Sequence, residues 1–522
     1  MINDTHFPKG FISSLVQVPG FNTESFIATH QNADALTSVR INPYKTITLN
    51  YTQPVPWCTN GFYLDSRPSF TFDPLFHAGC YYVQEASSMF IDHILHHIYN
   101  KDNGPVKVLD LCAAPGGKST LISSAIGDED LLVANEIIKT RVPVLTDNLN
   151  RWGRTNVVVT NNDPKAFARL KGFFDIIVVD APCSGSGMFR KDPAAMDEWS
   201  GGSVTMCQQR QERILADVYP ALAEDGYFIY STCSYSYEEN EAVLDWLCEK
   251  FELETVQIPL QTEWGVVESQ SEQHKAWGYR FYPDQVKGEG FFVACLRKRE
   301  DTGRLQNFRS KNSPKPNYKE IDLLKPYVNN PADLYFFKLN DDWLAINKHH
   351  RDSLETLQYF LYLKKSGIRL GKLAGNELIP DHELALSLIL NKDAFLQTEL
   401  TYEQAIAYLR KDNMDNFEIY GKGWSLMTYQ GHALGWAKLL PNRVNNYYPK
   451  ELRIMTQLDT RDKTLTSVDD CLGSVGNPVS CLLFLASINT LPYSTLPTCR
   501  PKAFLFHVPG QGCAVLGFRY PG

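Results

Sequence analysis

The chain has 522 residues and a formal net charge of −8, with an isoelectric point near 5.9. This length is more than one hydrophobic core usually holds, so we expect two or three domains. The acidic balance argues against nucleic-acid binding through overall charge, so any such contact must come from local basic patches. No stretch reaches the ~20 apolar residues of a membrane span and the first residues lack a signal segment, so we expect a cytoplasmic protein without a membrane partner.

Twelve cysteines are scattered along the chain. They form no CxxC pair and no Cys/His cluster at the spacing of zinc ligands, which predicts that the protein has no metal site. In the absence of an export signal, we expect these thiols to be reduced.

Residues 1–100 are predicted to form an N-terminal α+β region that recognises RNA or caps the site. A helix is expected over 11–30, and Ser38 begins a short strand that ends at Pro43. The apolar residues of 89–99 recur at helical spacing, and Ser87 is placed to cap this helix.

Strand and helix patterns then alternate, which predicts an α/β domain over residues 101–300. Short apolar runs bounded by turn residues are typical of buried parallel strands, and such alternation indicates a Rossmann-like, doubly wound sheet. The expected strands are 106–111, 131–135, 156–160, 176–179 and 227–230, followed by a hairpin of 279–283 and 290–296.

A glycine loop follows the first of these strands. Its residues are Cys112, Ala113, Ala114, Pro115, Gly116, Gly117 and Lys118. Glycine lets the backbone approach a ligand closely, but the pattern is neither that of dinucleotide enzymes nor that of a phosphate-binding loop. A nucleoside ligand without phosphates therefore fits better, and S-adenosylmethionine is the natural candidate.

Two acidic residues follow the next two strands. Glu136 lies about 20 residues beyond the glycine loop, where a carboxylate can bind both ribose hydroxyls of a nucleoside. Asp163 follows the third strand and is placed to bind an adenine amino group. The alternative is that both acids only cap helices or turns.

Two further strands each end in a loop that carries a cysteine. Asp180 and Cys183 follow the strand 176–179, and Cys233 follows the strand 227–230. Because ligands bind outside the carboxyl ends of parallel strands, two thiols and a carboxylate are expected at one rim of the sheet. That arrangement suits covalent catalysis. The alternative is a pair of ordinary buried cysteines.

The sequence changes character after residue 300, and we interpret 301–324 as a linker and 325–456 as a second domain. Near its end, aromatic residues are interleaved with Lys438, Arg443 and Lys450. Because aromatic rings stack on bases and cations bind phosphates, this pattern predicts an RNA-contacting surface. The alternative is that the tryptophans pack in a core.

Residues 457–522 fit neither domain. They are poor in charge, and Cys471, Cys481, Cys499 and Cys513 show no ligand spacing. We expect an atypical tail that is disordered or non-native.

Four motifs together resemble the Nop/Sun family of RNA cytosine-5 methyltransferases. They are the stretch Asp110–Lys118, the stretch from Asp180 to Pro193 with its Ala-Pro-Cys, the Ser-Thr-Cys-Ser from Ser231, and the Gly-Glu-Gly-Phe-Phe from Gly288. Over about residues 5–456 the chain is similar to the RsmF type, which acts on 16S ribosomal RNA and carries a PUA-like RNA-binding region. One departure is Asp284, where a basic or amide residue is expected.

The resemblance implies roles for individual residues. The S-adenosylmethionine site would be lined by residues Cys112 to Lys118, Glu136, Asp163 and Asp180. Cys233 would be the nucleophile and Cys183 would help to release the product. From the chemistry of the base, Asp180 would relieve negative charge at N3 by hydrogen bonding or by giving a proton. This needs a protonated carboxyl, which burial favours, or a proton shared with the base.

Two basic residues follow Cys183, namely Arg190 and Lys191. They are either contacts to a flipped base or a phosphate, or plain surface charges. Transfer RNA is the rival substrate. From another class, the chain would be a non-catalytic RNA-binding factor of ribosome assembly. A nucleotide-dependent oxidoreductase is disfavoured by the glycine pattern.

Overall fold

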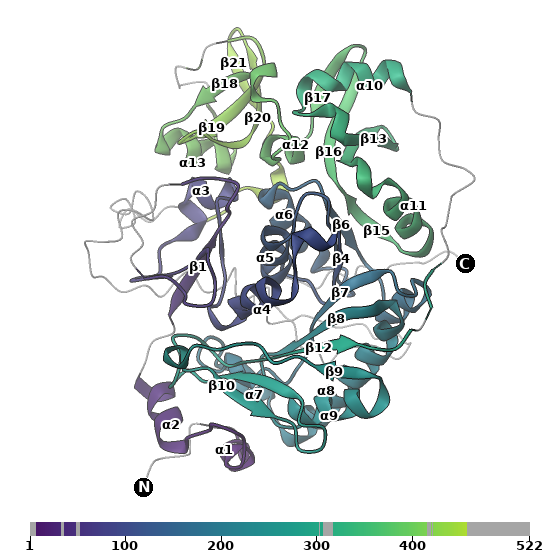
Figure 1. The fold of residues 1–522 in the computed structure, drawn as a ribbon. Helices are drawn as coiled ribbons and strands as arrows, with labels where there is room; N and C mark the ends of the chain where they lie inside the picture. The colour runs from purple at the N-terminus through teal and green to yellow at the C-terminus, as the bar shows by residue number, and fades with distance from the viewer. Residues whose placement is uncertain are drawn as a thin grey trace, which may run out of the picture. The chain divides into compact units, whose positions relative to one another are not determined.

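The computed structural model describes residues 7–32, 36–47, 53–301, 303–305, 317–414, 419 and 421–456. Its largest sheet has ten strands in the order β10-β11-β12-β8-β7-β4-β5-β6-β15, and β9 pairs with β12 (Figure 1). Five adjacent strands are parallel: β8 (Leu222–Thr232), β7 (Phe174–Asp180), β4 (Lys107–Asp110), β5 (Leu131–Asn135) and β6 (Val157–Thr160). The chain moves outward from β4 to β6, returns to β7 beside β4, and continues to β8. The doubly wound, Rossmann-like sheet is confirmed.

Alternate residues of the parallel strands face two separate cores. Val108 packs with one cluster and its neighbour Leu109 with the other, as the two-residue period of a strand requires. One face carries α4 (Phe90–Ile98), α5 (Gly117–Ala125) and α6 (Val142–Trp152). The other carries α8 (Gly201–Val218), α9 (Glu241–Lys250) and α11 (Arg351–Phe360). Burial on both faces explains why these strands read as continuous apolar runs.

Antiparallel strands extend the sheet beyond β8. They are β12 (Phe291–Lys298), β11 (Trp277–Phe281), β10 (Val267–Gln270) and β9 (Leu253–Thr255). The predicted hairpin is thus confirmed as β11 and β12.

The opposite edge of the sheet is completed from a distant part of the chain. Strand β15 (Leu363–Ser366) pairs antiparallel with β6, with Leu363 opposite Thr160. The stretch interpreted as a linker contains α10 (Tyr318–Leu324), whose Leu324 is buried in a core with Trp343. A strand that joins a sheet across 200 residues leaves no local pattern, so sequence analysis missed it.

The N-terminal region holds a sheet of β2 (Gly61–Leu64), β1 (Thr37–Ile41) and β3 (Tyr81–Val83), preceded by helices. The helix expected over 11–30 is two helices, α1 (Phe11–Leu15) and α2 (Thr23–Asn32). Gly20, between them, has φ +73°, which a continuing α-helix does not allow.

The expected cap of α4 is also wrong. The Ser87 hydroxyl donates to the carbonyl of Glu289 at 2.9 Å instead. The Glu85 carboxylate accepts from the amides of Ser87 and Ser88, at 2.8 and 2.9 Å, and so caps this turn. A carboxylate at this position also interacts favourably with the positive, N-terminal end of the helix dipole.

The C-terminal region contains two four-stranded sheets. One is β13 (Leu334–Leu339), β14 (Asp342–Asn347), β16 (Ile368–Ala374) and β17 (Glu377–Pro380). The other is β18 (Leu396–Glu399), β19 (Gly423–Tyr429), β20 (His432–Leu440) and β21 (Arg443–Asn446), with α13 (Tyr402–Arg410). Helix α12 (His382–Leu386) lies between the two sheets in the chain. Two short helices outside this region are α3 (Pro74–His77) and α7 (Ala194–Glu198).

The aromatic residues of the second sheet divide between surface and core. Trp436 and Trp424 are both buried, as the packing alternative predicts, whereas Tyr447 is 47% exposed. Lys438 lies over the Trp424 ring at 5.1 Å. The tail 457–522 lies outside the described residues. In the part of the chain described, no helix is long and apolar enough to cross a membrane.

Candidate active site

The glycine loop lies at the carboxyl end of β4, where the strand order reverses between β4 and β7. Helix α6 holds it from one side, because Asn148 donates to the carbonyl of Pro115 at 2.7 Å and Arg141 donates to that of Ala114 at 2.6 Å. Gly116 has φ +117°, and a Cβ there would lie 3.2 Å from Asn148 Cβ. The loop therefore needs glycine for both conformation and space.

Asp110, the last residue of β4, was not singled out from the sequence as a site residue. It is fully buried, and its Oδ2 accepts from the Ser119 hydroxyl at 2.6 Å. Its Oδ1 has no hydrogen-bond partner among the described residues. Burial raises the pKa of Asp110 to about 7. A buried acceptor without a partner beside a glycine loop fits a ligand that brings a donor or a positive charge.

The two predicted nucleoside-binding acids follow β5 and β6 as expected. The Glu136 side chain is buried, its Oε1 accepts from the amide of Ile138 at 2.7 Å, and Arg141 lies 3.7 Å from Oε2. Burial raises the pKa of Glu136, although Arg141 opposes the shift. Asp163 is exposed and accepts from the amide of Lys165 at 3.0 Å. Both acids cap turns. Glu136 follows β5, the strand next to β4, and Asp163 follows β6, one strand further out.

Asp180 lies at the end of β7 and joins the glycine loop to the next strand. Lys118 Nζ donates to its Oδ2 at 2.7 Å and the Ser231 hydroxyl donates to its Oδ1 at 2.8 Å. Burial lowers the pKa of Lys118, but the charge and hydrogen bond of Asp180, together with the charges of Asp110 and Cys233, raise it above its ordinary value. The Asp180 side chain is 32% exposed. The Asp180 carboxylate thus accepts from both Lys118 and Ser231, and its expected role at N3 of the base stays a prediction.

The two cysteine loops bring their thiols together. Cys183 Sγ lies 2.9 Å from Cys233 Sγ, and both residues are free cysteines of intermediate exposure. The amide of Gly187 donates to the carbonyl of Cys233 at 2.8 Å, which joins the two loops along the main chain. The contact with Cys233 and burial both raise the pKa of Cys183 well above its ordinary value. At neutral pH Cys183 is thus a thiol that faces the sulfur of Cys233.

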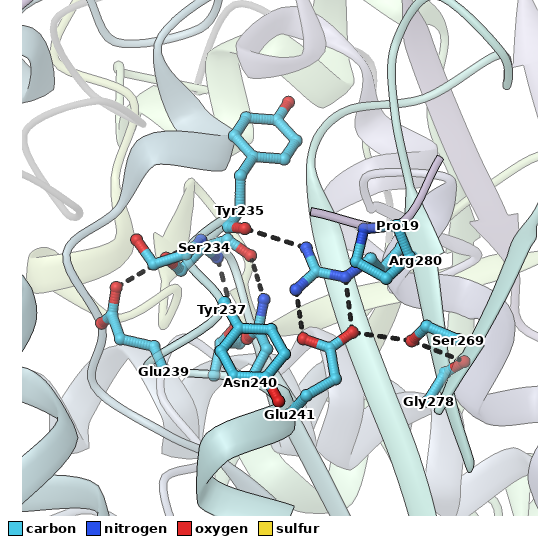
Figure 2. Close-up of polar contacts among 12 residues, drawn as sticks. Pro19, Ser234, Tyr235, Tyr237, Glu239, Asn240, Glu241, Ser269, Gly278 and Arg280 are labelled. Carbon is cyan, nitrogen blue, oxygen red and sulfur yellow. Dashed lines mark hydrogen bonds and ion pairs between the residues drawn. The ribbon is translucent and has the colours of Figure 1, made fainter. Parts of the chain in front are cut away.

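Glu239 is a second residue that was not singled out from the sequence. It precedes α9, which begins at Glu241, and its side chain points toward Ser234 (Figure 2). Its carboxylate accepts from the amide of Ser184 at 2.7 Å, and from the hydroxyls of Ser184 and Ser234 at 2.5 and 2.6 Å. No feature of the sequence distinguishes it from its neighbours.

Of the two basic residues after Cys183, the Arg190 side chain is buried, with its Nε 3.8 Å from a carboxylate oxygen of Glu289. Burial raises the pKa of Glu289 to about 7, against the charges of Lys191 and Arg190. The buried side chain of Arg190 is not a plain surface charge, and contact with a flipped base or a phosphate stays a prediction.

These features define a Rossmann-fold methyltransferase with a two-cysteine site. The loop, the unpaired acceptor of Asp110 and the carboxylate of Glu136 fit S-adenosylmethionine, whose methionine and ribose parts carry donors and whose sulfonium is cationic. No group of three or more potential metal ligands occurs within the described ranges.

Comparisons with known proteins agree over most of the chain. The model of 16S rRNA methyltransferase RsmB/F matches residues 97–297, that of the N-terminal domain of RsmF matches 7–86, and that of the methyltransferase RsmF PUA domain matches 395–454. The ribosomal RNA small subunit methyltransferase F of Psychromonas ingrahamii is 30% identical over 485 residues, covering 87% of this chain and 98% of the relative. That of Aliivibrio fischeri is 32% identical over 446 residues, covering 80% of this chain and 90% of the relative.

The crystal structure of PH0851 has the same fold, with a TM-score of 0.50 and 23% identity, over 56% of this chain and 66% of that one. The chain belongs to the family of ribosomal RNA small subunit methyltransferase F. It is an RNA methyltransferase that depends on S-adenosylmethionine.

Proposed function

We propose that the protein methylates carbon 5 of a cytosine in 16S ribosomal RNA through a covalent bond between Cys233 and carbon 6 of the base. The observation that carries this proposal is the pair of free thiols, 2.9 Å apart, at the ends of neighbouring strands beside Asp180. An N- or O-methyltransferase needs no such pair. The names of the relatives support the RNA substrate, and a ribosomal substrate implies a cytoplasmic reaction.

The reaction needs a nucleophile because carbon 5 of cytosine does not attack by itself. The Cys233 thiolate adds to carbon 6, which breaks the ring conjugation and makes carbon 5 an enamine-type carbon. S-adenosylmethionine supplies a methyl group on a sulfonium, and carbon 5 takes this methyl as the carbon–sulfur bond breaks. Water then takes the carbon 5 proton, the electrons of that carbon–hydrogen bond restore the ring double bond, and the Cys233 sulfur leaves carbon 6 as a thiolate.

The residues around Cys233 supply the other groups that the proposed reaction needs. Cys183 holds a proton against the Cys233 sulfur, so it stabilises the thiolate before attack and assists its departure as product forms. Asp180 meets N3, where negative charge develops on attack, and Lys118 is the adjacent proton source for this pair. A positive group at this position also favours ionisation of a nearby thiol.

The residues proposed to hold the cofactor surround these groups. They are Cys112, Ala113, Ala114, Pro115, Gly116, Gly117 and Lys118 of the loop, with Glu136, Asp163 and Asp180, and we add Asp110. We further propose that residues 1–100 and 325–456 recognise RNA on either side of the catalytic domain in the chain.

The test is transfer of labelled methyl from S-adenosylmethionine to small ribosomal subunits, free ribosomal RNA and tRNA, followed by nucleoside analysis. We expect label in 5-methylcytosine from 16S RNA, and no label with Cys233→Ala. Label only in tRNA would overturn the substrate, and label in another nucleoside would overturn the chemistry. Turnover by Cys233→Ala would refute the covalent step.

A further inference from the structure

Glu239 connects the two cysteine loops through the residues that follow each cysteine. Ser184 follows Cys183 and gives Glu239 two hydrogen bonds, one from its amide and one from its hydroxyl. Ser234 follows Cys233 and gives one from its hydroxyl, at 2.6 Å. A fourth comes from the amide of Gln211 on α8, at 3.3 Å. The carboxylate is thus tied to the main chain at one thiol and to the side chain beside the other.

The burial of this carboxylate has no charge partner to offset it. Glu239 is 0% exposed, and within the described segments no Lys or Arg forms an ion pair with it. Burial raises its pKa, and hydrogen bonds from Ser184, Ser234 and Gln211 oppose the shift. A buried carboxylate lowers stability unless its hydrogen bonds are complete, and an apolar residue of similar size would pack without that penalty. The buried Glu239 carboxylate therefore fixes the geometry of the two cysteine loops and does not add stability.

The main chain around Glu239 is itself held in place. Asn240 accepts from the hydroxyl of Thr232 at 2.6 Å and donates to the carbonyl of Ser234 at 2.8 Å. The hydroxyl of Tyr230 donates to the carbonyl of Glu239 at 2.6 Å. Hydrogen bonds thus hold the main chain on both sides of the loop that follows Cys233, and they fix the position of the Glu239 carboxylate (Figure 2).

We propose that Glu239 is a positioning residue that sets the distance between the thiols of Cys183 and Cys233. This inference rests on the proposed function, in which one thiol attacks and the other acts on its sulfur. A shift of the Ser184 main chain carries Cys183 with it, and freedom of Ser234 loosens Cys233. Displacement of about 1 Å at a reacting group costs roughly 100-fold in rate.

The loops have other links, so variants at Glu239 are expected to fold. The amide of Gly187 binds the carbonyl of Cys233, and the amide of Tyr235 donates to the Ser186 hydroxyl at 3.0 Å. Glu239→Gln retains one oxygen to accept from the Ser184 amide, and its amide group can donate to the two hydroxyls. Glu239→Ala removes all of these bonds. The pair of variants separates hydrogen-bond geometry from charge.

The first test probes the distance between the thiols of Cys183 and Cys233 and does not depend on methyl transfer. A trivalent arsenical that bridges two neighbouring thiols is titrated into the full chain, and Cys183→Ala defines the signal that requires the pair. We expect Glu239→Ala to lose pair-dependent capture and Glu239→Gln to keep it. Ser234→Ala, which removes the contact beside Cys233, is expected to weaken capture in the same direction. Glu238→Ala, at the exposed neighbouring position, is the matched control and is expected to match wild type.

Kinetics supply the second readout. Glu239→Ala is expected to lower kcat roughly 100-fold with the KM for S-adenosylmethionine unchanged, because the cofactor loop is not touched. Unaltered capture in both Glu239→Ala and Ser234→Ala would overturn the inference, as would wild-type kcat in Glu239→Ala. Methylation by Cys233→Ala would instead refute the proposed function, and the arsenical titration would still report whether Glu239 sets the pair.

Discussion

Lys118 and Asp180 form an ion pair 2.7 Å long that joins the cofactor loop to the first cysteine loop. The Lys118 side chain is 16% exposed and that of Asp180 is 32% exposed, so the pair lies at the boundary between the interior and solvent. It places an ammonium group beside the carboxylate that is proposed to meet N3 of the base. Cofactor binding and base activation therefore share one pair of side chains.

Replacing Lys118 by methionine keeps the length of the side chain and removes its charge. We expect Lys118→Met to lower kcat roughly 100-fold, the order of loss seen when one preorganised charge stabilising a transition state is removed. Steady-state methylation assays measure this, with the exposed Lys165→Met as the matched control. A rate close to wild type would show that the ion pair is only structural.

Cys183→Ala removes the thiol that faces the Cys233 sulfur. We expect methyl transfer to proceed once and release to fail, so that protein and RNA remain joined. A denaturing gel after incubation with RNA and S-adenosylmethionine should show a band of slow mobility. The double variant Cys183→Ala, Cys233→Ala should lack it. If the single variant also lacks the band while turning over normally, Cys183 has no part in release.

Glu136 is proposed to bind the ribose hydroxyls of the cofactor. Glu136→Ala should weaken binding of S-adenosylmethionine by about 2–4 kcal/mol, the value of a charge-assisted pair of hydrogen bonds. Calorimetry on the full chain measures this, with the exposed Glu224→Ala for comparison. An unchanged dissociation constant would place the ribose elsewhere.

Asp110 makes the stability of the cofactor-free protein depend on pH. Burial raises its pKa from an ordinary 3.8 to about 7, so between these values the folded state binds more protons than the unfolded state. The contribution of Asp110 to stability is therefore complete below pH 3.8 and is lost as pH rises through 7. Denaturant unfolding at pH 5 and pH 8 should show a smaller loss for Asp110→Asn than for wild type. Equal losses would contradict the assignment.

Arg280 and Glu241 form a buried ion pair beneath the Cys233 loop. Arg280 donates to both oxygens of Glu241 and, at 2.8 Å, to the carbonyl of Tyr235 (Figure 2). Arg280→Ala leaves a carboxylate buried without its partner, so we expect a loss of about 3–5 kcal/mol in the free energy of unfolding. Denaturant titration measures it. Arg299→Ala breaks an exposed pair with Glu254 and should change stability little; equal effects would refute the contrast.

The sequence alone determined the sheet and the position of its functional loops. The alternation of apolar runs with helical patterns is local, and parallel strands buried on both faces must be apolar throughout. Because ligands bind at the carboxyl ends of such strands, the sequence predicts Cys183 and Cys233 at one rim of the sheet. The thiol contact of 2.9 Å agrees with this prediction.

Only the tertiary structure decided which charges meet. Asp180 lies against Lys118, 62 residues earlier in the chain. The buried Glu239 carboxylate accepts from the amide of Ser184, 55 residues away. Strand β15 joins β6 across about 200 residues. Such pairs carry no local periodicity, because they form only when the packing of the whole sheet has brought the segments together.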